Sequence, residues 1–176
     1  MPTEISGSTG VNKIQDGTVV DADINSSAAI AGSKISGSFG KVLQVVNAYH
    51  ASEVTTNSTS WIDTGLTATI TPSSTSSKIL ILINQTAAKQ GDAGMRIRFL
   101  RGSTVIRTVT EKVGFTGSGD DTWSYIGTVS VGWLDTPSTT SATTYHTEFR
   151  ASSSGHNVIA QVDNDTSTIT LMEIAA

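Results

Sequence analysis

Short segments in which apolar and hydroxyl-bearing residues alternate make up most of the sequence from residue 41 onward. Leu66, Ala68 and Ile70 alternate with threonines, and the segment 145–151 alternates in a similar way. Successive side chains of a β-strand point to opposite faces of a sheet, so this period of two predicts half-buried strands. Turn signals recur between these segments, and none has the period of an amphipathic helix. The sequence therefore predicts an all-β protein of about nine or ten strands, folded as a jelly-roll-like β-sandwich.

Four segments carry more specific predictions. Lys78 to Thr86 includes five consecutive aliphatic residues, which predicts a central strand covered on both faces. The turn at 101–103 joins two strand-like segments and predicts a β-hairpin. The polar segment 53–60 predicts a loop. In the strand expected over 123–134, Tyr125 has the parity of the apolar residues that follow it, which predicts a core position for its ring.

The first forty residues differ from the rest in composition and in the spacing of their apolar residues. Their few aliphatic residues recur every five or six positions, a spacing typical of neither a helix nor a strand. So few apolar groups do not offset the backbone entropy lost on ordering, about 1–2 kcal/mol per residue. We therefore expect an N-terminal attachment or stem segment over residues 1–40 and a β-sandwich head over residues 41–176.

Two alternatives remain for the stem. It is a disordered arm, or it is ordered by copies of itself around a symmetry axis or by docking on a larger body. In the symmetric arrangement the axis is lined by Ile14, Val19, Ile24, Ile30 and Ile35.

Composition excludes several classes of protein. The chain has no cysteine, which rules out disulfides and Cys-ligated metal sites. Only 15% of its residues are charged and the net charge is −4, unlike the basic surface of a nucleic-acid-binding protein. Its apolar runs are too short to span a bilayer, and its start lacks the pattern of a secretory signal peptide. The polar residues are mainly hydroxyls, 24 Ser and 27 Thr.

No set of residues points to catalysis. The three histidines lie too far apart in sequence for a spaced metal motif, and no nucleophile elbow occurs. We therefore expect no enzymatic activity, no cofactor and no metal.

Three features are candidates for surface binding. Trp123 begins a strand directly after a glycine-rich loop, and an exposed aromatic ring there suits a sugar. Arg96 and Arg98 belong to a cluster of four arginines that suits an anionic partner, although solvent-facing or inter-subunit pairs with acidic residues explain them better. Asp120 and Asp121 offer oxygen ligands for Ca²⁺, or simply form a solvated turn.

Several phrases of the sequence resemble proteins of tailed bacteriophages. The segment 14–37 (IQDGTVVDADINSSAAIAGSKISG) is similar to linkers of tail fibres and related appendages, notably of marine and cyanobacterial phages. The later phrases GKVLQVV at 40–46, the segment 61–81, LDTPSTTSATTY at 134–145 and ITLMEI at 169–174 resemble the C-terminal heads of such proteins.

The resemblance implies a homotrimer on a virion, attached to other virion proteins through residues 1–40 and made in the host cytoplasm. It implies a head of the tumour-necrosis-factor or complement type that faces outward or caps the assembly, and we expect this head to contact a host surface glycan or protein. The stem is short for a tail fibre, so a capsid head fibre, decoration protein or collar protein is the alternative. A glycan depolymerase is a remote alternative, because no carboxylate pair is evident.

Overall fold

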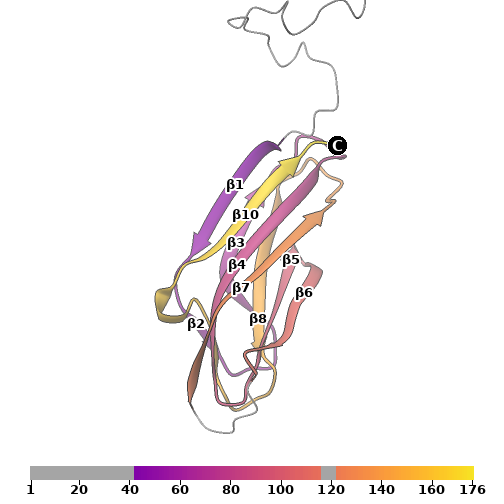
Figure 1. The fold of residues 1–176 in the computed structure, drawn as a ribbon. Helices are drawn as coiled ribbons and strands as arrows, with labels where there is room; N and C mark the ends of the chain where they lie inside the picture. Colours follow the sequence, from indigo (N-terminus) through magenta and orange to yellow (C-terminus); the bar gives the residue numbers. More distant parts are fainter. Residues whose placement is uncertain (1–41, 116–121) are drawn as a thin grey trace, which may run out of the picture. The chain divides into compact units, whose positions relative to one another are not determined.

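The computed structural model describes residues 42–115 and 122–176, which form ten β-strands (Figure 1). The strands are β1 (Val42–His50), β2 (Val54–Thr56), β3 (Ile62–Ile70), β4 (Lys78–Gln90), β5 (Met95–Arg101), β6 (Thr104–Val113), β7 (Trp123–Asp135), β8 (Thr143–Ala151), β9 (Val158–Ala160) and β10 (Ser167–Ile174). A short 3-10 turn, η3 (Val162–Asn164), precedes β10. The predicted stem and its five aliphatic residues lie outside the described residues.

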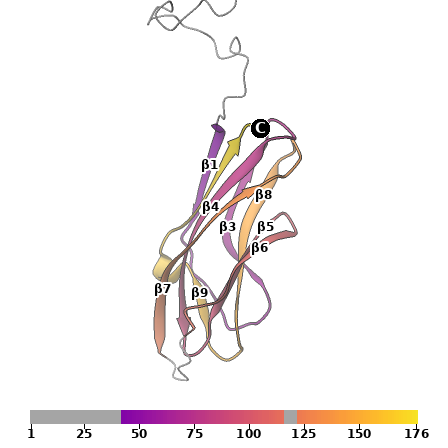
Figure 2. The ribbon, with the colours of Figure 1, turned by 45° about the vertical axis from the view of Figure 1, so that its right-hand side comes forward.

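The strands form two antiparallel sheets stacked face to face (Figures 1 and 2). In the first sheet the main order is β1-β10-β4-β7, and in the second it is β3-β8-β5-β6. The short strands β9 and β2 extend the first sheet beside β4, so it has six strands in all. The two main sets of four strands, with the chain passing between them, form the jelly-roll arrangement. The predicted fold class is therefore confirmed, and so is the β5–β6 hairpin.

Strand β4 changes its partner halfway along one edge. It pairs with β10 from Lys78 to Asn84 and with β9 from Ala87 to Lys89, while β7 covers the other edge throughout. The break leaves Gln85 and Thr86 without a ladder partner on that edge. Buried backbone groups must be paired, and the neighbouring residues supply the partners: Ser167 Oγ accepts from Thr86 N at 3.0 Å, and Gln161 N donates to Thr86 O at 3.1 Å.

A buried polar cluster, which we call the waist, fills the space between the sheets at this break. The Thr64 and Thr147 hydroxyls lie 2.6 Å apart, Thr147 Oγ1 donates to Gln85 Oε1 at 3.0 Å, and Gln85 Nε2 donates to Ser167 Oγ at 2.9 Å. With its amide oriented to satisfy both ends, Gln161 donates to Thr64 O and accepts from Gln85 Nε2. All five side chains are at most 1% exposed.

The waist separates two apolar clusters. One contains Phe99, Tyr145 and the inward aliphatic residues of β3, β4 and β10, and the other contains Met95, Phe149 and small residues of β4 and β9. Each cluster packs on both sheets, so the waist ties the sheets together where apolar packing is interrupted.

Three sequence predictions need correction. The segment 53–60 was expected to be a loop, but β2 forms within it by pairing with β9. Strand β4 is central, yet the described residues leave the outer side of its aliphatic run partly open, and Leu82 is 37% exposed. Tyr125 is not a core residue, because the pairing shifts between Gly127 and Tyr125. This bulge reverses the alternation, so Ile126 packs against the core while Tyr125 is 68% exposed.

A buried carboxylate fixes the end of the first sheet. Glu173 accepts hydrogen bonds from Gln44 Nε2 at 2.6 Å and from Ser73 N at 2.7 Å, which ties β10 to β1 and to the β3–β4 loop. Burial alone would raise the pKa of Glu173, but these hydrogen bonds outweigh that effect and lower its pKa to about 2.

The waist predicts a contrast between two threonines of β8. Thr147→Val keeps the side-chain volume but leaves the Thr64 hydroxyl and Gln85 Oε1 short of a buried partner, so we expect a loss of about 1–3 kcal/mol in the free energy of unfolding. Thr144→Val removes one partner of a similar threonine pair, Thr69–Thr144 at 2.7 Å, on the solvent side. We expect it to change stability by less than about 0.5 kcal/mol. Equal effects in urea denaturation would contradict a structural role for the waist.

Glu173 predicts an acid-sensitive stability. Its pKa is lower in the folded chain than the ordinary value of 4.5, so its contribution is present above about pH 5 and is lost as the pH falls toward 2. We expect Glu173→Gln to lower stability at pH 7 by about 1–3 kcal/mol and to flatten the pH dependence in that window. Glu111→Gln, at an exposed ion pair with Arg96, is the control. If the free energies of unfolding of wild type and Glu173→Gln fall in parallel from pH 5 to pH 2, the assignment is refuted.

Candidate functional site

The outer face of the first sheet carries a cross-strand row of apolar side chains. Val45 of β1 is opposite Met172 of β10, Met172 is opposite Leu80 of β4, and Leu80 is opposite Leu134 of β7. Val45 is 56% exposed and Leu134 is 49% exposed, while the two between them are half-buried. One uninterrupted row therefore crosses four strands and faces away from the core.

Neighbouring residues widen this row into a patch. We call it the apolar face; its members are Leu43, Val45, Leu80, Leu82, Leu134, Met172 and Ile174. Gly132 lies beside Leu82, and a side chain there would contact the leucine. The next positions toward the middle of the sheet are polar and bond to each other, as in Asn47 Nδ2 to Thr170 Oγ1 at 2.7 Å and Ser130 Oγ to Asn84 Oδ1 at 2.7 Å. Apolar patches with a polar rim of this kind mark interaction surfaces.

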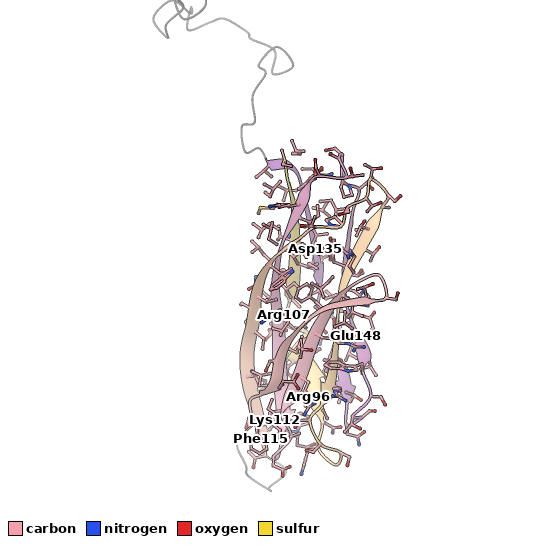
Figure 3. All side chains as sticks on the ribbon, turned by 90° about the vertical axis from the view of Figure 1, so that its right-hand side faces the viewer. Arg96, Arg107, Lys112, Phe115, Asp135 and Glu148 are labelled. Carbon is pink, nitrogen blue, oxygen red and sulfur yellow. The ribbon has the colours of Figure 1, made fainter. Side chains whose placement is uncertain are left out.

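The arginine cluster lies on the other sheet and is engaged within the chain. Arg96 forms an ion pair with Glu111 at 3.2 Å, and Arg98 Nε donates to Glu148 at 2.7 Å. Figure 3 shows Arg96 and Arg107 at separate heights of this side rather than at one point. Arg107 stacks on Trp133, 5.0 Å from the ring centre. The role of Arg96 and Arg98 in binding an anion stays a prediction, and their carboxylate partners compete with such a ligand.

Trp123 lines a small pocket at the end of β7 opposite to Leu134. The pocket has a volume of about 170 Å³. Its floor is apolar, with Ala88 of β4 and the side chains of Ile159 and Val162. Trp123, which is 44% exposed, and Tyr125 supply aromatic surface, and Glu53 and Asp163 supply carboxylates.

The acidic side of the pocket is built by a tight turn. Gln161, Asp163 and Asn164 all have φ between 54° and 62°, the left-handed region that residues with a side chain rarely adopt. The waist holds the first of them through the Gln161 amide. The turn then presents Asp163, whose backbone N–H donates to Glu53 Oε2 at 3.0 Å and whose Oδ2 accepts from Tyr125 at 2.8 Å.

Negative charge dominates this pocket. The hydrogen bond to Asp163, its charge, and the charges of Asp165 and Glu53 raise the pKa of the Tyr125 hydroxyl. Among the ion pairs of residues 42–115 and 122–176, none involves Glu53, Asp163 or Asp165. The pocket thus combines aromatic walls with carboxylates that lack a basic partner in the described part of the chain.

Sequence reasoning singled out one wall of this pocket. It named Trp123 and missed Tyr125, Glu53 and Asp163, which come from three separate segments. The bulge in β7 hid Tyr125, and only the left-handed turn brings Asp163 beside the rings. Asp120 and Asp121 lie outside the described residues.

The described segments hold no group of three or more His, Asp or Glu side chains placed to bind a metal ion. They also contain no helix long and apolar enough to cross a membrane.

Comparison with known proteins adds a distant structural likeness. No family model matches the sequence, and no curated protein matches it. Among solved structures, the chain is similar to VP2 of infectious bursal disease virus in the crystal structure of its subviral particle, with 12% sequence identity and a TM-score of 0.44. The similarity covers 74% of this chain, which spans only 38% of that VP2 chain.

Proposed function

We propose that this chain is a non-enzymatic structural protein of a bacteriophage virion, a short tail fibre or tail-tip appendage that assembles as a homotrimer. The observation that carries the proposal is the apolar face on the outside of a jelly roll. The likeness of the segment 14–37 and of the head phrases to phage appendages supports the same assignment.

The apolar face suits contact with another copy of the chain. Its exposed leucine and valine side chains gain free energy on burial, about 25 cal/mol per Å² of apolar surface removed from water. The face begins at Leu43 and Val45, close in sequence to the proposed stem. If the stems associate around an axis through Ile14 to Ile35, they bring the starts of the heads together, and the apolar face begins beside that point.

The head then presents its remaining surface to the host. A host surface glycan or protein is the proposed partner, with weak contacts per head strengthened by several heads on one particle. Attachment to other virion proteins is assigned to residues 1–40.

Self-association tests the proposal directly. We expect the full chain at micromolar concentration to show about three times its mass of 18.3 kDa in light scattering. Leu134→Asp puts a charge into the contact and should shift the mass toward one chain, because a buried unpaired charge costs several kcal/mol. Val105→Asp changes a similarly exposed residue on β6 of the other sheet and should leave the mass unchanged. A monomeric wild-type chain would refute the trimer.

Truncation tests whether residues 1–40 serve attachment while residues 41–176 fold on their own. We expect residues 41–176 alone to unfold at the same temperature as the head in the full chain, since the waist and both apolar clusters lie within this segment. Incorporation into particles should be lost, because residues 1–40 are proposed to attach the head. An unfolded fragment would place the domain boundary elsewhere. Particles that lack the protein, adsorb normally and lose heat resistance would identify a capsid decoration protein instead.

A further inference from the structure

The pocket beside Trp123 has the size of a chemical group rather than of an extended chain. Its volume of about 170 Å³ lies below the ~300–1,000 Å³ of sites that enclose drug-sized ligands. The floor of Ala88, Ile159 and Val162 is apolar and supplies few hydrogen bonds. A ligand must therefore find its specificity at the aromatic and acidic sides.

The acidic side offers hydrogen-bond acceptors and negative charge. Asp163 receives one hydrogen bond from Tyr125, and Glu53 receives one from the Asp163 backbone and one from Thr55 at 3.2 Å. An ionised carboxylate has about four acceptor positions, so both retain capacity for a donor. An anionic ligand is repelled by this pair.

The aromatic side favours the same type of ligand. Trp and Tyr rings attract a cation placed over their faces, by about 0.5–2 kcal/mol, and aromatic walls are the usual means of binding ammonium groups. A neutral sugar would stack on Trp123 as well, but it would gain nothing from the two carboxylate charges. The combination of rings and carboxylates therefore distinguishes a cation from a neutral ligand.

We propose that this pocket binds the ammonium group of an amine-bearing molecule, with Trp123 and Tyr125 against its carbon frame and Asp163 and Glu53 facing its charge. This proposal names a ligand class for the host contact proposed above. Its biological role rests on that proposed function, whereas the binding itself does not. Binding is measurable on the full chain in solution, so its failure is distinguishable from failure of the virion assignment, which the mass and particle experiments test.

Three variants separate the contributions of charge and ring. Asp163→Asn removes a charge and keeps a residue that tolerates the left-handed conformation well, so the turn should persist. Trp123→Phe keeps a smaller ring and should weaken binding less than Trp123→Ala. Glu111→Gln removes one charge on the opposite sheet and is the matched control.

The experiment is an NMR titration of ¹⁵N-labelled full-length protein. Binding is measured from the chemical shifts of the backbone amides of residues 123–125 and 159–163. The probes are glucosamine and choline chloride, with N-acetylglucosamine and 3,3-dimethylbutan-1-ol as their uncharged counterparts. We expect an amine that binds to have an affinity at least about tenfold higher than that of its uncharged counterpart. This affinity should fall as the salt concentration is raised. Asp163→Asn should lose about tenfold in affinity, whereas Glu111→Gln should not.

The two amines distinguish the source of the group. Binding of glucosamine alone indicates an amino sugar, and binding of choline alone indicates a quaternary ammonium headgroup. The proposal is overturned if an uncharged counterpart binds as tightly as its amine, if Asp163→Asn leaves the affinity unchanged, or if neither amine shifts these amides at millimolar concentration. Spectra of the variants that match wild type away from the pocket establish that each is folded.

Discussion

The pairing break in β4 is the constraint on which the rest of the molecule depends. One strand serves two partners on the same edge, β10 and then β9, so the sheet has a gap in its hydrogen-bonded ladder. A gap of this kind is tolerable inside a protein only if other groups pair with the backbone N–H and C=O that lack a ladder partner. Ser167 and Gln161 do so, and Gln85, Thr64 and Thr147 extend the bonding across to the other sheet. The jelly roll therefore has a polar waist between two apolar clusters.

The waist also reaches the surface through a single turn. Gln161 is held in the left-handed conformation by bonds to the buried cluster, and the two left-handed residues that follow bring Asp163 next to Tyr125. An acidic group on an unsupported loop would sample many positions and lose binding free energy on ordering. Here buried hydrogen bonds of Gln161 hold the start of the turn, and Asp163 itself is bonded to Tyr125 and Glu53. The acidic side of the pocket is therefore positioned by contacts within the chain.

The fold followed from the sequence because its signals are local. Alternation of apolar residues with threonine fixed most strands, and the Gly102 turn marked the hairpin between β5 and β6. The errors arose where pairing decided the outcome. The bulge at Ile126 turns Tyr125 from the core to solvent, and no local pattern distinguishes it from regular alternation. The aliphatic run in β4 indicated burial on both faces, but burial of its outer side requires a covering layer that the described head does not itself provide. The pocket could not be predicted from local sequence patterns, because its walls come from three separate parts of the chain: residue 53, residues 123–125 and residues 159–163.

The two sheets use a weakly charged composition in different ways. On the outer side of the second sheet, Arg98 and Arg150 both lie over the Trp61 ring, 4.3 and 4.7 Å from its centre, and Glu148 neutralises Arg98. There Arg96 and Arg98 pair with carboxylates, and Arg150 contacts the Trp61 ring and Thr59 O. The outer side of the first sheet differs: one end exposes leucine and valine, and the other exposes aromatic rings beside carboxylates that form no ion pair with the described residues. Free energy is available from covering the first end with apolar surface and from bringing a cation to the second. A single sheet can therefore support assembly at one end and recognition at the other, because the hydrogen-bonded polar rows between them keep the two surfaces separate.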